Sequence, residues 1–363
     1  MSWTDVGLTI LRVGALVGVI TVVVLLLTYL ERKALGRIQM RMGPMRTGFH
    51  GTLQPFADAL KLLLKEDVVP SVKDKAVFWL APLVVFVPAL VLWITIPFTH
   101  DLVVRNLEFG IFYIIAVSVV SIVGIVMAGW GSNNKYALLG GARAAAQLIS
   151  YELPIILVVV AVVMIAGTLN MREIVEGQGD FPYVYLQPLG FVVFLGAGLA
   201  ELRRTPFDIP TAESEVMGGP FVEYSGIHWG MFFLAEYANT FAIGALATVL
   251  FLGGWSGPLL PGLLWFAIKT IAVIFVIFWL RATLPRFRID QLMAFCWKFL
   301  IPISFLNIFL TGIYAFYEWP DWSMFTMSAV TLVGGGYMIW WHGRRRAAQR
   351  TETLRLRREK LVA

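Results

Sequence analysis

The sequence predicts an all-α polytopic membrane protein with about nine transmembrane helices. Of its 363 residues, 58% are hydrophobic and 14% are charged, whereas a soluble domain has roughly 45–50% apolar and about 25% charged residues. Apolar runs approaching the roughly 20 residues that a spanning helix needs recur along the whole chain. They lie at 9–30, 76–98, 110–130, 151–169, 187–202, 230–252, 263–283, 299–317 and 323–341.

The distribution of basic residues predicts the orientation of these helices. Cytoplasmic loops of membrane proteins are enriched in Lys and Arg. With the N-terminus outside, the segments expected inside hold 25 of the 29 Lys and Arg residues. These segments are 31–75, 131–150, 203–229, 281–298 and 342–363. We therefore expect the N-terminus outside and the C-terminus in the cytoplasm.

This orientation gives the chain a simple domain organisation. Residues 1–341 are expected to form a single multi-helix transmembrane domain. Its cytoplasmic loops, counted from the ends of the spans, are 31–75, 131–150, 203–229 and 284–298. Residues 342–363 are expected to form a basic cytoplasmic tail that touches anionic lipid headgroups. No nucleic-acid-binding surface is indicated.

The few cysteines and histidines argue against cofactors held by this chain alone. A single cysteine, Cys296, excludes an internal disulfide and a cluster ligated by several cysteines of the chain. The four histidines are scattered, so we expect no metal or haem site. The N-terminal segment has no basic region followed by a cleavage site, so we expect no removable signal.

The first inner segment combines charges with an amphipathic pattern. Glu31 and Arg32 end the first apolar run, and a loop rich in glycine follows. Over 53–66, apolar residues recur at three- and four-residue spacing with polar residues between them. This pattern predicts an amphipathic helix in the membrane interface. It is either a lipid-facing stabiliser or one wall of a portal for an amphiphilic ligand.

One carboxylate lies inside the fourth apolar run. An alanine-rich stretch from Ala142 is a good helix former and leads into this run, in which Pro154 predicts a kink. Glu152 is then at least two turns inside an apolar helix, where a charge costs roughly 2.5–3.5 kcal/mol. We expect Glu152 to face a polar interior, to be paired, or to carry a proton.

Carboxylates are concentrated between the fifth and sixth runs. Residues 199–237 contain six of the 23 acidic residues: Glu201, Asp208, Glu213, Glu215, Glu223 and Glu236. Pro206 and Pro210 prevent a continuous helix there. Because the first and last carboxylates lie within apolar runs, where ionisable groups are usually functional, a buried acidic path is predicted rather than a solvated face.

The end of the seventh run carries the complementary charge. Arg281, Arg286 and Arg288 follow one another at its inner end. Their planar guanidinium groups suit carboxylates of the acidic segment or of another protein.

These residues resemble the quinone-chamber membrane subunit of proton-pumping NADH:quinone oxidoreductase, respiratory complex I. In the first loop the matching motifs are ERK (31–33), GRIQ (36–39), RMGP (41–44), LQP (53–55) and AD (57–58). Further along they are GW (129–130), SNNKY (132–136), SYE (150–152), RTPFD (204–208), EY (223–224), AEY (235–237) and LRA (280–282). The resemblance extends over about residues 10–305.

The resemblance implies a quinone chamber and a proton path. The chamber entrance would lie between the first helix, the interfacial helix and the sixth helix. The residues that would line or gate it are Glu31, Arg32, Asp58, Lys61, Arg281, Arg286 and Arg288. The carboxylates that would lead protons away are Glu152, Glu201, Asp208, Glu213, Glu215, Glu223 and Glu236, starting beside Asp58. Quinone would be the substrate.

The resemblance also implies partners. Iron–sulfur clusters and FMN would be held by other complex I subunits, namely the peripheral-arm subunits. Further partners would be small membrane subunits, antiporter-like subunits and membrane lipid. The location would be the inner (plasma) membrane of a bacterium.

Two positions depart from the family pattern, and three other functions remain open. Thr211 stands where many members have an acidic residue, and Val119 where some have a membrane-embedded Glu. The main alternative is a homologous membrane subunit of an energy-converting hydrogenase or related dehydrogenase. A stand-alone secondary transporter should show inverted repeats, and the sequence has none that we recognise. A third alternative is a scaffold whose charges serve assembly alone.

Overall fold

The computed structural model describes residues 3–179, 181–317, 319–338, 341 and 344, and these ranges contain no strand. Seven helices are long and apolar enough to cross a membrane. They are α1 (Trp3–Ile38), α3 (Lys75–Val91, extended by a 3-10 turn at Leu92–Ile94), α4 (Gly110–Gly131), α5 (Lys135–Ala166), α10 (Gly226–Phe251), α11 (Gly262–Thr283), and α12 (Ile289–Phe295) continued through a π-helical turn at Cys296–Leu300 into α13 (Ile301–Tyr317). The prediction of an all-α polytopic membrane protein is confirmed.

The two other predicted spans are also helical. The shorter apolar helix α8 (Pro188–Glu201) takes the fifth position, and residues 321–338 are helical where the ninth run was predicted. Segment 131–150 is mostly helix because α5 already begins at Lys135, before the alanine-rich stretch that favours a helix. The basic tail lies outside the described residues, apart from Arg344.

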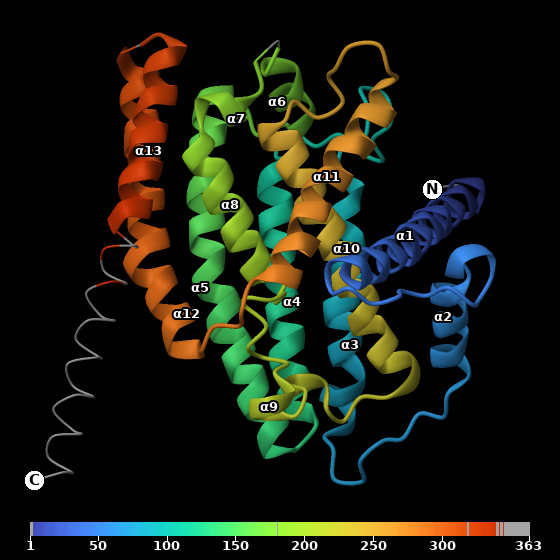
Figure 1. The fold of residues 1–363 in the computed structure, drawn as a ribbon. Helices are drawn as coiled ribbons and strands as arrows, with labels where there is room; N and C mark the ends of the chain where they lie inside the picture. Colours follow the sequence, from blue (N-terminus) through green and yellow to red (C-terminus); the bar gives the residue numbers. More distant parts are fainter. Residues whose placement is uncertain (1–2, 180, 318, 339–340, 342–343, 345–363) are drawn as a thin grey trace, which may run out of the picture.

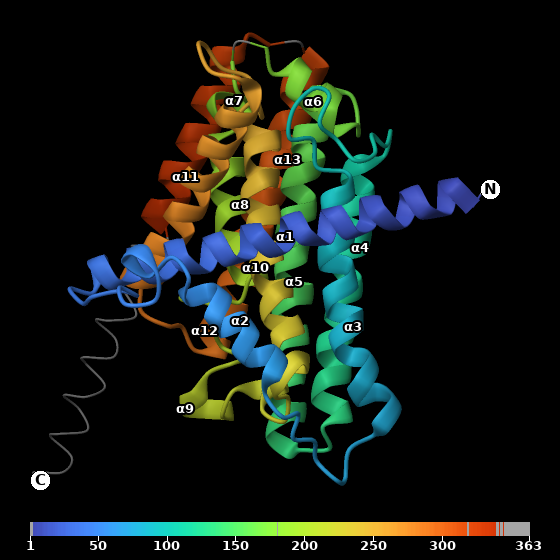
Figure 2. The ribbon, with the colours of Figure 1, turned by 90° about the vertical axis from the view of Figure 1, so that its right-hand side faces the viewer.

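Most of the helices run side by side, and α1 crosses them (Figures 1 and 2). α10 packs against α3 and α11, while α5 packs against α4, α8 and α13. α1 contacts α10, α11 and α2 (Gln54–Leu64). Figure 2 shows α1 running across the face of the bundle, with its C-terminal part next to α2. This crossing brings the charged end of α1 onto helices that are distant in the sequence.

Close packing depends on glycine where α3 and α4 meet. A Cβ atom added at Gly124 of α4 would lie 3.0 Å from the backbone nitrogen of Val85 on α3. Small residues let membrane helices approach closely and gain van der Waals contact. Gly124 therefore fixes this pair of helices in a tight contact.

The predicted interfacial helix is present with nearly the expected bounds. α2 begins with Pro55 in its first turn, where a missing N–H costs no hydrogen bond. The apolar stripe that the sequence predicted is exposed at Phe56, Leu60, Leu63 and Leu64. A helix with such a stripe suits the boundary between headgroups and acyl chains.

Lys269, a charged residue within α11, points to the C-terminal end of α10. Its Nζ donates hydrogen bonds to the carbonyl oxygens of Leu252 (2.6 Å), Gly254 (3.2 Å) and Ser256 (2.7 Å). A cation is favourable at a helix C-terminus, where carbonyl groups lack intrahelical partners. Lys269 therefore caps α10 and the loop after it.

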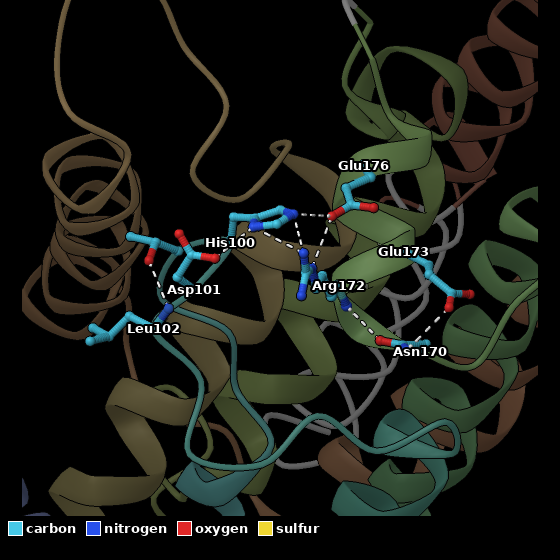
Figure 3. A network of polar contacts seen from close by, with 8 residues as sticks. His100, Asp101, Leu102, Asn170, Arg172, Glu173 and Glu176 are labelled. Atoms are coloured by element: carbon cyan, nitrogen blue, oxygen red, sulfur yellow. Dashed lines mark hydrogen bonds and ion pairs between the residues drawn. The ribbon is translucent and has the colours of Figure 1, made fainter.

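The loops at the α6 end of the bundle carry an exposed polar network, shown in Figure 3. Arg172 of α6 (Met171–Gly177) pairs with Glu176 at 3.0 Å, and His100 of the α3–α4 loop lies 3.4 Å from the same carboxylate. The hydrogen bond from His100 lowers the pKa of Asp101, which is fully exposed. Exposed pairs of this kind contribute little to stability. The network attaches a loop to α6 at the bundle end opposite α9 (Glu213–Val216) (Figure 1).

Candidate functional site

A chain of four charges lies where α1 meets the helix bundle. Glu31 of α1 is 2% exposed, and its two carboxylate oxygens accept hydrogen bonds from Arg204 Nη1 at 2.9 and 3.1 Å. Arg281 Nη1 forms a second ion pair with Glu31. On the other side, Arg204 Nε lies 2.9 Å from Glu236 Oε1. We call Arg281–Glu31–Arg204–Glu236 the charge chain; its two positive and two negative groups balance.

The charge chain connects four elements of the fold. Glu31 lies on α1, Glu236 on α10 and Arg281 in the last turn of α11, while Arg204 follows α8. The guanidinium carbon of Arg204 also lies 4.6 Å from the centre of the Tyr237 ring, a favourable cation–π contact. Removing one partner of a buried ion pair typically costs about 3–5 kcal/mol. The charge chain therefore holds α1 in its crossing position.

The residue before Arg204 lies next to a different set of carboxylates. Arg203 adjoins Glu201 and Glu152 on the wall of a small cavity. Its φ of 54° is rare for a residue with a side chain, and such strain concentrates at functional sites. Burial lowers the pKa of the Arg203 guanidinium, whereas the carboxylates of Glu236 and Asp208 raise it. Two consecutive arginines thus connect the charge chain with a second acidic group.

This second group surrounds two small cavities. One has a volume of ≈20 Å³ and is lined by Glu152, Glu201, Arg203, Asn239 and Ser118, among others. The other, of ≈50 Å³, shares Glu201, Asn239 and Ser118. A water molecule needs roughly 10–15 Å³ of such space and two to four polar partners. Both cavities therefore have room for water, and their shared polar residues come from α4, α8 and α10, with Glu152 of α5 lining the smaller one.

The polar atoms around these cavities have unused hydrogen-bonding capacity. Arg203 Nη1 and Asn239 Oδ1 are buried without a hydrogen-bond partner among the described residues. Ser118 Oγ lies 3.5 Å from Glu152 Oε1. Buried polar groups are normally paired with protein or water. These atoms therefore favour a hydrated connection between Glu152 and Glu201.

The acidic loop binds a cation and a hydroxyl at Asp208. One carboxylate oxygen of Asp208 accepts a hydrogen bond from Arg286 Nη2 at 2.9 Å, and the other accepts one from the Thr211 hydroxyl. Thr211, at a position where the resemblance predicts an acidic residue, is a hydrogen-bond donor, so Asp208 has a hydrogen-bond partner here instead of a like charge.

Two further loop carboxylates contact α5 and the residue before it. Glu215 Oε2 accepts a hydrogen bond from Arg143 Nη1 at 2.7 Å, and Glu223 Oε1 accepts one from Asn134 Nδ2 at 2.6 Å. The side chain of Glu213 lies outside the described residues, although its backbone begins α9. These contacts attach the loop 203–229 to α5 at two points.

The residues expected at a chamber entrance are divided between paired and exposed positions. α2 contacts both α1 and α10. Arg32 pairs with Asp58, which also accepts a hydrogen bond from Gln54 Nε2 at 3.1 Å. Lys61 and Arg288 are exposed, and the Arg288 backbone caps α12 through Gln291. Only Glu31 and Arg281 of this set belong to the charge chain.

Three residues that organise the site were not predicted from the sequence. Arg203 and Arg204 follow Glu201 closely, but no role was expected for them. No role was expected either for Gln147, whose Nε2 donates to the carbonyls of Ala200 (2.7 Å) and Phe207 (2.9 Å). The signal for the arginines was two consecutive cations directly after an apolar run. A single glutamine in a helix gives no such signal.

The acidic loop is held against α5 by an approach that only glycine permits. A Cβ atom added at Gly140 of α5 would overlap the backbone of Gly219, in the 3-10 turn Gly219–Phe221. We expect Gly140→Ala to displace the loop and to destabilise the protein by about 1–3 kcal/mol, as overpacking typically does. The melting temperature of the purified protein in its complex measures this effect.

The matched control is Gly196→Ala on α8, where an added Cβ atom has nothing within 4 Å. Alanine in a helix is favoured over glycine by about 1 kcal/mol, so the control should be neutral or stabilising. Equal melting temperatures for the two variants would show that the contact between Gly140 and Gly219 does not hold the loop.

Comparisons with known proteins identify a family. The family model described as NADH dehydrogenase matches residues 11–312. The chain is 54% identical over 297 residues to the H subunit of the NADH-quinone oxidoreductase of Dehalococcoides mccartyi (strain CBDB1), covering 82% of this chain and 84% of the relative. It is 49% identical over 321 residues to the protein of the same name from Bacillus thuringiensis (strain Al Hakam), covering 86% and 95%. Among the described residues, no group of three or more His, Cys, Asp or Glu could hold a metal ion.

Proposed function

The chain belongs to the NADH dehydrogenase family, and on that premise we propose that it couples quinone reduction to proton translocation in an NADH-quinone oxidoreductase. It is a multi-pass membrane subunit of this proton-translocating enzyme. The observation that carries the coupling role is the pair Arg203–Arg204. Arg204 belongs to the charge chain, and Arg203 lines the small cavity that Glu152 and Glu201 also line.

The quinone chamber is proposed where α1, α2 and α10 meet. Quinone is the substrate, and no redox centre is assigned to this chain. The headgroup would approach Glu31, Arg32 and Asp58, with Arg281, Arg286, Lys61 and Arg288 nearby. The exposed apolar stripe of α2 supports an entrance from the membrane.

Coupling would start from the charge chain. Quinone reduction consumes protons and so changes the charge beside Glu31. Because Arg204 pairs with both Glu31 and Glu236, a weaker attraction to Glu31 would shift Arg204 towards Glu236. In a poorly solvated site, such charges titrate as a coupled set rather than one by one. A shift of the Arg203–Arg204 pair would then change the proton affinity of Glu201.

The proton path proper is proposed to run from Glu201 to Glu152. Ser118 and Asn239 would hold water between the two carboxylates, because both line the cavities that Glu201 shares. Asp208, Glu213, Glu215 and Glu223 are proposed as the loop part of the path, and Glu236 of α10 as its link to the charge chain. Pairing of this loop with Arg286, Arg143 and Asn134 lets a change in charge move it.

The partners are other subunits of the oxidoreductase. We propose that these include peripheral-arm subunits carrying iron–sulfur clusters and FMN, small membrane subunits and antiporter-like subunits. The proposed location is a bacterial inner (plasma) membrane, with the N-terminus outside and the C-terminus in the cytoplasm. The excess of Lys and Arg in the segments assigned inside supports this orientation.

The test is purification of the tagged chain from its own membranes in mild detergent. We expect NADH-oxidising and antiporter-like subunits to be recovered with it in equal amounts, and the preparation to reduce quinone with NADH. Recovery of the chain alone or as a homo-oligomer would contradict this function and favour a stand-alone transporter. Recovery with hydrogenase subunits would favour the hydrogenase alternative, in which NADH is not the electron donor.

A further inference from the structure

A separate cavity lies between α1, the loop after it and α11. Its volume is ≈960 Å³, within the range of ligand pockets in proteins. None of the residues assigned above to the quinone chamber or the proton path is among those that line it. The cavity therefore calls for an occupant of its own.

One side of this cavity is strongly basic. Lys33, Arg37, Arg41 and His50 line it, and no carboxylate does. Lys33 Nζ contacts Met45 Sδ at 2.9 Å, and Arg41 Nε donates to the Gln39 side chain at 2.8 Å. Among the described residues none of these basic groups is in an ion pair. We call Lys33, Arg37, Arg41 and His50 the basic wall.

The basic wall differs from the other cationic positions around the site. Arg32, Arg143, Arg204, Arg281 and Arg286 each pair with a carboxylate of this chain. In the basic wall, Lys33, Arg37 and Arg41 face one cavity without a carboxylate partner, and Arg37 and Arg41 are exposed. Clustered positive charge on one wall of a cavity attracts an anion to it. The part of the chain that the structure describes supplies no such anion there.

The opposite side of the cavity is apolar and belongs to membrane-spanning helices. Leu30 of α1 and Ile271 and Phe275 of α11 line it and are exposed. Leu27, Ile274 and Phe278 lie behind them in the core. The cavity is therefore amphipathic, with an anion-binding wall facing an apolar wall that continues along helices suited to acyl chains.

We propose that this cavity binds one anionic phospholipid. The phosphate lies at Lys33, Arg37 and Arg41, and an acyl chain lies along Leu30 and Phe275. Basic pockets between transmembrane helices bind lipid headgroups in this way. A quinone headgroup is uncharged and would leave the basic wall uncompensated, whereas free phosphate would leave the apolar wall exposed. The lipid satisfies both walls.

A lipid bound in this cavity would have a structural effect on α1. The cavity is bounded by the C-terminal part of α1, which also carries Glu31, and by α11, which carries Arg281. A lipid held there would fill the space between the two helices that the charge chain connects. It would thus support the crossing position of α1 from the side opposite α2.

The experiment measures lipid binding to the purified complex by native mass spectrometry. The probes are phosphatidylglycerol, phosphatidylcholine and inorganic phosphate, each titrated onto the delipidated complex. In the double variant Arg37→Gln/Arg41→Gln, the affinity of this site for phosphatidylglycerol should fall by on the order of 10-fold or more. Phosphatidylcholine should bind weakly to both proteins, and inorganic phosphate should not displace the lipid.

Two controls keep the result interpretable. Arg46→Gln removes the same charge from the same loop, but Arg46 is exposed and does not line the cavity; its binding should match the unmodified complex. Arg37→Lys/Arg41→Lys keeps the charge and should retain binding even if the glutamine variant fails to assemble.

Several outcomes would overturn the proposal. One is equal binding of the two lipids, and another is equal loss in the Arg46 control. Displacement by inorganic phosphate alone would reduce the site to an anion site without lipid. A crosslink from Arg37→Cys or Arg41→Cys to an acidic segment of a neighbouring subunit would make the cavity a protein interface.

Discussion

Replacing Glu31 with glutamine is expected to destabilise the protein by about 3–5 kcal/mol, because two guanidinium groups then lose their buried counter-charge. Arg204 and Arg281 both pair with Glu31, and Arg204 is 3% exposed. A glutamine oxygen can accept a hydrogen bond, but it carries no charge to offset two cations. We expect less assembled complex in the membrane and a lower temperature of thermal inactivation. Native gels and an inactivation curve of NADH:quinone activity measure the two effects.

A matched control and a compensating variant sharpen this prediction. Glu66→Gln makes the same chemical change at an exposed position of the first loop, and it should have no measurable effect on stability. Glu31→Gln combined with Arg281→Gln removes one of the uncompensated cations and should recover part of the loss. A Glu31→Gln protein as stable as the control would show that the charge chain does not hold α1.

The fold was largely predictable because a bilayer imposes strict demands. A spanning helix needs a minimum apolar length, so the nine runs coincide with helices. The period of apolar residues located α2 to within two residues at each end. The way α1 crosses the bundle could not be predicted, because the outward side of α1 carries no pattern that specifies a partner.

The sequence indicated which carboxylates belong to the candidate site, but it did not indicate which residues form ion pairs with them. Carboxylates in apolar runs are costly, so Glu152, Glu201 and Glu236 stood out individually. The contact between Arg204 and Glu31 joins residues 173 positions apart and follows only from the packing of α1 on α10 and α11. Thr211 was expected only to lack the carboxylate that the resemblance predicts at its position. Its hydrogen bond to Asp208 gives it a role that the sequence did not indicate.

Replacing Glu201 with glutamine is expected to reduce proton translocation by an order of magnitude or more, on the scale of a lost proton-transfer group. Glutamine keeps the size and shape of the side chain, but it cannot take up and release a proton. Glu201 is the carboxylate common to both small cavities and adjoins Arg203. Glu152→Gln should act in the same direction, because Glu152 lines the smaller of these cavities.

The central claim is that these two carboxylates connect quinone reduction to proton movement. The direct measurement is the number of protons translocated per NADH oxidised, in sealed vesicles containing the purified complex with Glu201→Gln or Glu152→Gln. We predict normal assembly with a greatly reduced proton yield for both variants. Loss of assembly with a normal yield in the remaining complex would favour a scaffold role. A full proton yield and full quinone reductase rate in both variants would contradict the proposed path.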